Sequence, residues 1–165
     1  MAMPPDTLSQ TIGVLTRREV EARMLIPLIE ALGKKFDRDE VLAVVRETVI
    51  QLAQEQGESL ADQLGGCGSL HFMKSLSYWT QDDALQLEVL EQSESQLDFN
   101  VKRCRYAEMY NALGAPELGA IFSCNRDFAL INGFNKDADL KRSQTIMAGA
   151  SHCDFRYNFP EKETN

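Results

Sequence analysis

A short stretch near the C-terminal end of the chain gathers several side chains that can take part in chemistry. In GASHCDFRYNF, residues 149–159, the residues His152, Cys153, Asp154 and Arg156 lie within five positions in an otherwise apolar and aromatic setting. Alternate residues of a strand point to opposite faces, so Cys153 would share one face with the aromatic residues, and His152, Asp154 and Arg156 would share the other. The stretch is either a strand with one face in water or one wall of an active site.

Two earlier segments carry further candidates. In CRYAEMYNALG, Cys104 and Glu108 are four residues apart, which predicts that they share one helix face, with Tyr106 on a neighbouring face. In SCNRDF, Cys124 and Asp127 follow a predicted short helix, where we expect the chain to turn. Polar residues after an element are favoured positions for binding. A solvent-exposed glutamate on an amphipathic helix is the alternative reading of Glu108.

The chain has two histidines, His71 and His152. His71 lies in SLHFMKSL, among residues typical of a core, and we expect a structural role for it. His152 borders the polar stretch and is kept as a candidate. The sequence contains no C-x-x-C pair and no H-E-x-x-H motif, so we expect no metal site. It also lacks the G-x-S-x-G, P-loop and dinucleotide fingerprints, so we expect no cofactor.

Composition limits the class of protein further. A chain of 165 residues fits one domain, and it can bury enough surface to form a core without disulfides. The net charge of −8 argues against a nucleic-acid partner, because no excess of basic residues neutralises phosphates. No secretory signal and no membrane-spanning run is recognised. We therefore expect a cytoplasmic protein with reduced thiols, with a homo-oligomer left open. The net charge says little about small substrates, because a local pocket can differ in sign from the whole surface.

Residues 1–80 have a helical pattern. The segment REVEARMLIPLIEALGKKF predicts a helix with a kink or break at Pro27. Asp37 or Asp39 can cap a second helix, which we expect to end at Gly57. A third helical segment is predicted from Ser59 through LHFMKSLSYW, interrupted at GGCGS. The expected buried stripe of the first of these helices is formed by Val20, Met24, Leu25, Leu28 and Leu32.

Residues 81–165 combine strands and helices. Apolar and polar residues alternate in ALQLEVLE and QLDFNVKR, which predicts two half-buried strands joined by the turn QSES. DFALINGF, LKRSQTIMAG and CDFRYNF are predicted as further extended segments. CRYAEMYNALG and the segment from Pro116 to about Cys124 are predicted as helices. The fold class is therefore α+β, a single domain in which an N-terminal helical layer packs on a mainly antiparallel sheet formed by the C-terminal half.

The order of the three segments CRYAEMYNALG, PELGAIFSCNRDF and RSQTIMAGASHCDFR resembles the L-2-amino-thiazoline-4-carboxylic acid hydrolase family of bacteria. The resemblance covers about residues 101–159, and the helical N-terminal part resembles the family only in general pattern. The residues that match the family are Cys104, Tyr106, Glu108, Tyr110, Cys124, Asp127, Arg142, Thr145, Gly149, Cys153, Asp154, Phe155 and Arg156.

The resemblance implies hydrolytic opening of a small thiazoline ring, which gives N-carbamoyl-cysteine on a route to cysteine. The ring carbon of such a substrate belongs to an amidine-like group, which a carboxylate can bind through two parallel hydrogen bonds. The substrate's own carboxylate calls for a guanidinium from Arg156, Arg142 or Arg126. The candidate catalytic residues are Cys124, Asp127, Cys153, Glu108 and His152, and the candidate substrate-binding residues are Arg156, Arg142, Asp154, Tyr106 and Cys104.

Two chemical routes are open. A carboxylate or His152 could deprotonate water as a general base. Alternatively, the thiolate of Cys124 or Cys153, its pKa lowered by a nearby cation, could attack first, and the sequence slightly favours this thiol route. A rival function is a non-catalytic sensor or binding domain with a cysteine-lined pocket, because fold does not decide function. A second rival, a zinc-stabilised module, would carry stoichiometric metal.

Overall fold

A computed structural model of the chain describes residues 6–160. The N-terminal half is helical and contains α1 (Leu8–Ile12), α2 (Val14–Gly33), α3 (Arg38–Leu64) and α4 (Ser69–Thr80). Of the two predicted caps, Asp37 and Asp39, the Asp37 carboxylate caps α3. It accepts hydrogen bonds from the amides of Asp39 and Glu40, both at 3.0 Å. A single-turn 3₁₀ helix, η1 (Gln81–Asp83), then leads into the sheet.

The C-terminal half forms one sheet and a second set of helices. The strands β1 (Leu85–Gln92), β2 (Gln96–Cys104), β3 (Asp139–Lys141) and β4 (Cys153–Asn158) are arranged in the order β1-β2-β4-β3. Each neighbouring pair is antiparallel. Between β2 and β3 lie α5 (Arg105–Ala112), α6 (Pro116–Gly119), the π-helix η2 (Ala120–Cys124) and α7 (Arg126–Phe134), and η3 (Ile146–Ala148) precedes β4.

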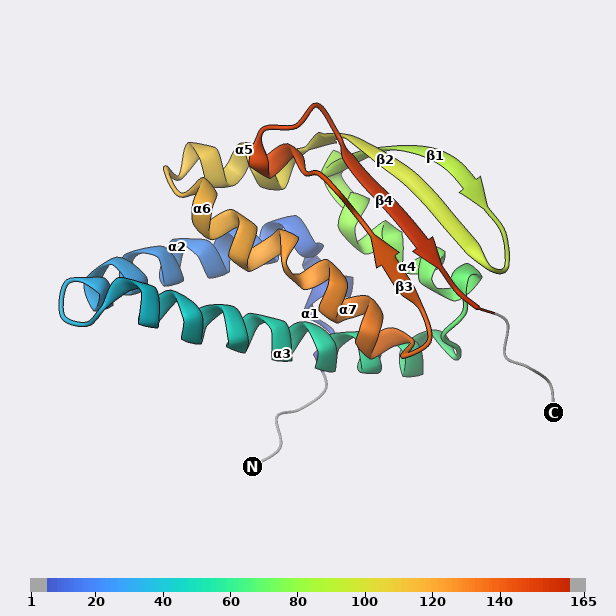
Figure 1. Cartoon of the computed structure of the whole chain (residues 1–165), viewed down its shortest axis with the longest axis horizontal. Helices are drawn as coiled ribbons and strands as arrows, with labels where there is room; N and C mark the ends of the chain where they lie inside the picture. The colour runs from blue at the N-terminus through green and yellow to red at the C-terminus, as the bar shows by residue number, and fades with distance from the viewer. Residues whose placement is uncertain (1–5, 161–165) are drawn as a thin grey trace.

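The helices cover one face of the sheet (Figure 1). In that view α4 lies behind the strands, and α3 runs beside α7. Phe72 of α4 packs against Tyr157 of β4, with ring centroids 4.9 Å apart. Phe99 of β2 stacks on its register partner Phe155 of β4, also at 4.9 Å. These contacts form the core between helices and sheet, and they confirm the predicted α+β fold with helices packed on an antiparallel sheet.

Several local predictions are wrong. DFALINGF was expected to be extended, but it forms most of α7, because Leu130, Ile131 and Phe134 bury one helix face. LKRSQTIMAG contributes only the last residues of the short strand β3 and the single turn η3. Pro27 does not break α2, which continues through it to Gly33.

Gly57 does not end α3, which continues to Leu64. A Cβ atom at Gly57 would lie 2.1 Å from the carbonyl oxygen of Leu130 in α7, so this glycine allows two helix backbones to touch. Gly65, in the left-handed conformation at φ 72°, ends the helix instead.

Three of the five residues of the expected stripe on α2 are exposed, although Leu25 packs against the core. Val20, Met24 and Leu28 are 63%, 72% and 50% exposed. The buried face contains Val14, Ala22 and Ile29 together with Arg18, which is only 2% exposed. A pattern that counts arginine as a surface residue cannot find this face. Arg18 is tolerated inside because its guanidinium forms an ion pair with Glu21.

Candidate functional site

A cavity lies on the helix-covered side of the sheet, and its polar residues come from both halves of the chain. We call it the inner cavity. Its volume, counted as the space open to the centre of a water molecule, is about 80 Å³. Its walls are mainly apolar, and among the described residues Asp127 is the one carboxylate that lines it. Three guanidinium groups and three thiols face the same space, from Arg18, Arg126 and Arg142 and from Cys104, Cys124 and Cys153.

Asp127 and Arg142 form an ion pair in this cavity. The Arg142 side chain is 8% exposed. It also donates a hydrogen bond to the carbonyl oxygen of Cys124 at 3.1 Å, and its guanidinium lies 5.4 Å from the ring centroid of Phe155. These contacts fix the guanidinium against the carboxylate from several sides. Burial raises the pKa of Asp127 to about 6, although the charges of Arg142 and Arg126 act in the opposite direction.

The three thiols are buried or half-buried, and two of them accept hydrogen bonds from backbone amides. Cys104 ends β2, and its sulfur accepts a hydrogen bond from the amide of Ala107 at 3.4 Å. The sulfur of Cys153 accepts one from the amide of Ile146 at 3.2 Å. Burial raises the pKa of Cys104 to about 11, that of Cys124 to about 12, and that of Cys153 above its ordinary value. The expectation of a lowered thiol pKa is therefore wrong, because burial outweighs the nearby cations.

The π-helix η2 places Cys124 at the cavity. Residues 120–124 form one wide turn that continues into α7 through Asn125, so SCNRDF is not the predicted turn. Single π-turns of this kind occur often at functional sites. Ser123 and Cys124 from the π-turn and Arg126 and Asp127 from the start of α7 all line the inner cavity. Four of five consecutive residues thus contribute to one wall.

Arg126 is a half-buried cation without a carboxylate partner in the described part of the chain. Its guanidinium donates to the Gln56 side-chain oxygen at 2.8 Å, and no carboxylate among residues 6–160 lies within ion-pair distance. Burial and the charge of Arg18 lower the pKa of Arg126 below its ordinary value. A guanidinium nevertheless stays protonated in proteins. Arg126 therefore has no ion-pair partner in the described part of the chain, and its guanidinium can pair with an anion that enters the cavity.

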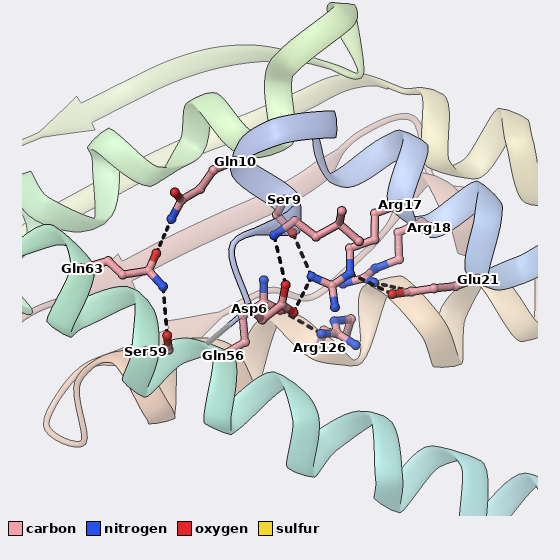
Figure 2. Close-up of polar contacts among 11 residues, drawn as sticks. Asp6, Ser9, Gln10, Arg17, Arg18, Glu21, Gln56, Ser59, Gln63 and Arg126 are labelled. Carbon is pink, nitrogen blue, oxygen red and sulfur yellow. Dashed lines mark hydrogen bonds and ion pairs between the residues drawn. The ribbon is translucent and has the colours of Figure 1, made fainter. Parts of the chain in front are cut away.

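A wider groove opens beside the inner cavity, between α1 and α2 on one side and α3 on the other (Figure 2). We call it the outer groove. Its volume, counted in the same way, is about 700 Å³. Gln56, Trp79 and Arg126 line both spaces, so they form the wall between them. Arg17 in the groove is already paired, with Asp6 at 2.7 Å and Glu21 at 2.8 Å.

Two candidates from the opening stretch, Asp154 and Arg156, lie outside the inner cavity, because alternation along β4 points them to the other face of the sheet. Asp154 accepts hydrogen bonds from the amides of Ser143 and Gln144, both at 2.9 Å. Burial alone would raise the pKa of Asp154, but a hydrogen bond from the Ser143 hydroxyl, together with those from the amides, lowers it below its ordinary value. Arg156 donates to the carbonyl oxygen of Phe99 at 3.0 Å.

His152 and Glu108 are also placed away from the inner cavity. The His152 ring lies within hydrogen-bond distance of the Ser151 hydroxyl, at 2.9 Å, and of the Gln144 amide. Glu108 is exposed and forms an ion pair with Arg103 at 2.7 Å. Its hydrogen bond with Arg103 lowers its pKa. Glu108 does not share a helix face with Cys104, because α5 begins at Arg105, after that cysteine.

Of the predicted site residues, the structure brings six together: Cys104, Tyr106, Cys124, Asp127, Arg142 and Cys153 line the inner cavity. Tyr106 lies beside the thiols, and its hydroxyl donates to the carbonyl oxygen of Trp79 at 3.1 Å. Sequence reasoning missed Arg18, Gln56 and Trp79. Arg18 and Gln56 carry no local motif, whereas Trp79 is the single tryptophan of the chain and could have been singled out.

The described residues show two further features. Within residues 6–160, no group of three or more His, Cys, Asp or Glu side chains is arranged to hold a metal ion. No helix in the same range is long and apolar enough to cross a membrane.

Comparisons with known proteins address the fold and the family. The structure is similar to a trafficking protein particle complex subunit 3 from Naegleria fowleri, solved covalently bound to palmitic acid, with a TM-score of 0.53. The two are 13% identical, and the match covers 88% of this chain and 96% of the other, so the likeness concerns the fold alone. No match was found among curated proteins. The family model described as L-2-amino-thiazoline-4-carboxylic acid hydrolase matches residues 17–157. The chain therefore belongs to the L-2-amino-thiazoline-4-carboxylic acid hydrolase family.

Proposed function

We propose that this protein is a hydrolase that opens the ring of 2-amino-thiazoline-4-carboxylate or of a related small cyclic amidine. The family supports the reaction class. The observation that carries the proposal is the composition of the inner cavity: a half-buried carboxylate with a pKa of about 6 and a guanidinium without a carboxylate partner among the described residues share one mainly apolar space. A small zwitterion with an amidine and an acid group complements that set of charges.

Arg126 binds the carboxylate of the substrate. Its guanidinium is the one in the cavity that no described carboxylate already neutralises, and Gln56 holds it in the wall. A guanidinium pairs with a carboxylate through two parallel hydrogen bonds, which fixes orientation as well as position. Arg142 is less suited to this task because its guanidinium already forms an ion pair with Asp127. Binding the acid at Arg126 leaves the ring towards Asp127 and the thiols.

Asp127 acts as the general base. In its ionised form it takes a proton from a water molecule, whose oxygen attacks the ring carbon bonded to both nitrogens and to sulfur. Attack moves the C=N electron pair onto the ring nitrogen, which already carries a proton in the amidinium form of the substrate. The hydroxyl then becomes the carbonyl and releases its remaining proton to solvent. As it does so the carbon–sulfur bond breaks, and the electron pair leaves with the sulfur. A thiolate has a pKa of about 8.5, above that of Asp127, so the proton held by Asp127 passes to the leaving sulfur. One water is consumed, and N-carbamoyl-cysteine is released.

The thiols of the cavity serve as uncharged walls in this mechanism. Because burial raises the pKa of Cys124 to about 12, its thiolate is scarce at neutral pH and a thiol-first route is disfavoured. Thiols are also weak hydrogen-bond donors, so they can surround a sulfur heterocycle without competing for Arg126.

A second candidate function is a non-catalytic domain that binds a small molecule. Protonated thiols and apolar walls favour this function, because a site that only binds a molecule needs no reactive group. A protein of the same fold, the trafficking complex subunit, was solved with palmitic acid bound, which supports a role of this fold in holding apolar ligands.

One experiment separates the two functions. The purified protein is incubated with 2-amino-thiazoline-4-carboxylate, free thiol is followed with a thiol reagent, and the product is identified by mass spectrometry. Hydrolysis predicts a new thiol and a mass gain of one water per substrate. Binding without thiol release, seen as a change in Trp79 fluorescence, would support the binding domain and contradict the hydrolase.

A further inference from the structure

A third space, the apolar pocket, lies between α4 and the sheet and adjoins the inner cavity. Phe72 and Leu76 of α4 form one side of it, and Phe99 and Tyr157 of the sheet form another. The volume of this pocket, counted in the same way, is about 50 Å³. Trp79, Leu85, Val101, Asp127, Leu130 and Phe155 line both the pocket and the inner cavity. The proposed general base therefore stands where the two spaces meet.

The walls of the apolar pocket are hydrocarbon and aromatic apart from Asp127, the Thr80 hydroxyl and the Tyr157 hydroxyl. The ring of Phe99 stacks on Phe155 at 4.9 Å and on Tyr157 at 6.0 Å, so the sheet side is a rigid aromatic surface. Water in such a space finds few hydrogen-bond partners. Unfilled space among apolar side chains also loses dispersion contacts. The chemistry of the pocket therefore suits an apolar group rather than solvent.

A bare thiazoline acid uses only part of this arrangement. Its carboxylate is satisfied at Arg126 and its amidine lies near Asp127, both of which line the inner cavity. It has no apolar group to extend past Asp127 into the pocket beside Leu76. The ring methylene, between sulfur and the acid-bearing carbon, is the ring carbon that carries neither charged group. A substituent there can occupy the adjoining pocket while the charged groups keep their partners.

We propose, building on the hydrolase function above, that the substrate class is a 2-amino-thiazoline-4-carboxylate, or a like cyclic amidine acid, bearing a short alkyl or aryl substituent that enters the apolar pocket. Acid binding at Arg126 and chemistry at Asp127 are unchanged. The substituent adds buried apolar contact, and each buried methylene strengthens binding about fourfold.

The test compares two compounds, the unsubstituted thiazoline acid and its analogue with a propyl group on the ring methylene between sulfur and the acid-bearing carbon. We expect the analogue to have a kcat/KM at least roughly tenfold higher. Binding is followed separately through Trp79, the single tryptophan of the chain, which lines the inner cavity, the outer groove and the apolar pocket. Fluorescence thus reports occupancy even where no hydrolysis occurs.

A matched pair of variants on α4 places the substituent. Leu76→Phe reduces the space in the pocket and keeps Trp79 as the single tryptophan, and we expect the ratio of the two kcat/KM values to fall towards one. Leu70→Phe adds the same ring on the same helix at a residue that is 43% exposed, and it should leave the ratio unchanged.

The outcomes separate this inference from the function on which it rests. If the wild type hydrolyses the unsubstituted acid with a kcat/KM equal to or higher than that for the analogue, the inference is wrong and the hydrolase stands. A ratio that Leu76→Phe does not lower also overturns the inference. Hydrolysis of neither compound, with tighter binding of the analogue that Leu76→Phe abolishes, overturns the hydrolase but supports the pocket. Neither hydrolysis nor binding overturns both.

Discussion

Asp127 is subject to two opposing effects. Burial raises its pKa, and the guanidinium groups of Arg142 and Arg126 lower it, with a result of about 6. The carboxylate is the form that accepts a proton, so protonation below that pH removes the base. We expect kcat/KM for ring opening to rise as the pH increases through about 6 and then to level off. The pH profile of thiol release measures this. A midpoint near the ordinary aspartate value of about 4 would contradict the assigned environment.

Arg126 is assigned to the substrate's acid group. Replacing it in Arg126→Gln removes a charge-assisted hydrogen bond worth about 1.5–3 kcal/mol, which corresponds to roughly a tenfold to hundredfold rise in KM. We expect a smaller effect on kcat, since Arg126 does not touch the proton that moves. The control is Arg23→Gln, because the Arg23 side chain is 63% exposed and forms its ion pair with Glu19, away from the cavity. An unchanged KM in Arg126→Gln would show that the acid binds elsewhere.

The cysteines are assigned no covalent role. Cys124→Ser and Cys153→Ser are therefore expected to keep turnover within about tenfold of the wild type, with any loss arising from packing in a buried wall. Initial rates at neutral pH check this, with circular dichroism to confirm folding. If either folded variant lost turnover by about a thousandfold or more, the thiol route of nucleophilic attack would be restored.

At the scale of the elements, the backbone contact between α3 and α7 positions the polar wall of the cavity. A Cβ at Gly57 would lie 2.1 Å from the carbonyl oxygen of Leu130, and one at Gly133 would lie 2.0 Å from that of Gln54. The contact sets Gln56 of α3 next to Arg126 of α7, where the hydrogen bond between them forms. Two glycines therefore determine how close the helices that carry this wall can come.

Gly57→Ala should for this reason destabilise the fold strongly, by about 3 kcal/mol or more, since helix backbones must separate to admit the methyl group. Denaturant unfolding measures the change. The matched control is Gly114→Ala: Gly114 has φ 70° and no atom within 4 Å of a built Cβ, so only conformational strain of about 1–2 kcal/mol is expected. Equal losses in the two variants would contradict the assigned helix contact.

The sequence predicted strands best where alternation was clear. β1, β2 and β4 were found because polar and apolar residues alternate along them, as in Leu97, Asp98 and Phe99. α7 was missed because its short apolar run is compatible with the periodicity of a helix or of a strand, and because Gly133 weakens the helical propensity. The exposed stripe on α2 was mistaken for the core because Arg18, a charged residue, belongs to the buried face.

At the scale of the whole molecule, the inner cavity joins residues that are far apart in the chain. Alternation separated Cys153 from Asp154 correctly, but which face of β4 meets the helices depends on tertiary packing. Arg18 and Gln56 lie in helices without any local signal of function, so only the folded chain shows that they face Arg126 and the thiols. The single domain, the cytoplasmic location and a homo-oligomer stay predictions.

Removal of the base tests the central claim most directly. The initial rate of thiol release from 2-amino-thiazoline-4-carboxylate at neutral pH is compared in the wild type, in Asp127→Asn and in Asp137→Asn, an exposed aspartate after α7. Asn preserves the size of Asp127 and can still accept from Arg142, so thermal unfolding should show both variants folded. The account predicts a loss of about a thousandfold in Asp127→Asn and less than about twofold in Asp137→Asn. A folded Asp127→Asn protein that releases thiol at the wild-type rate would contradict it.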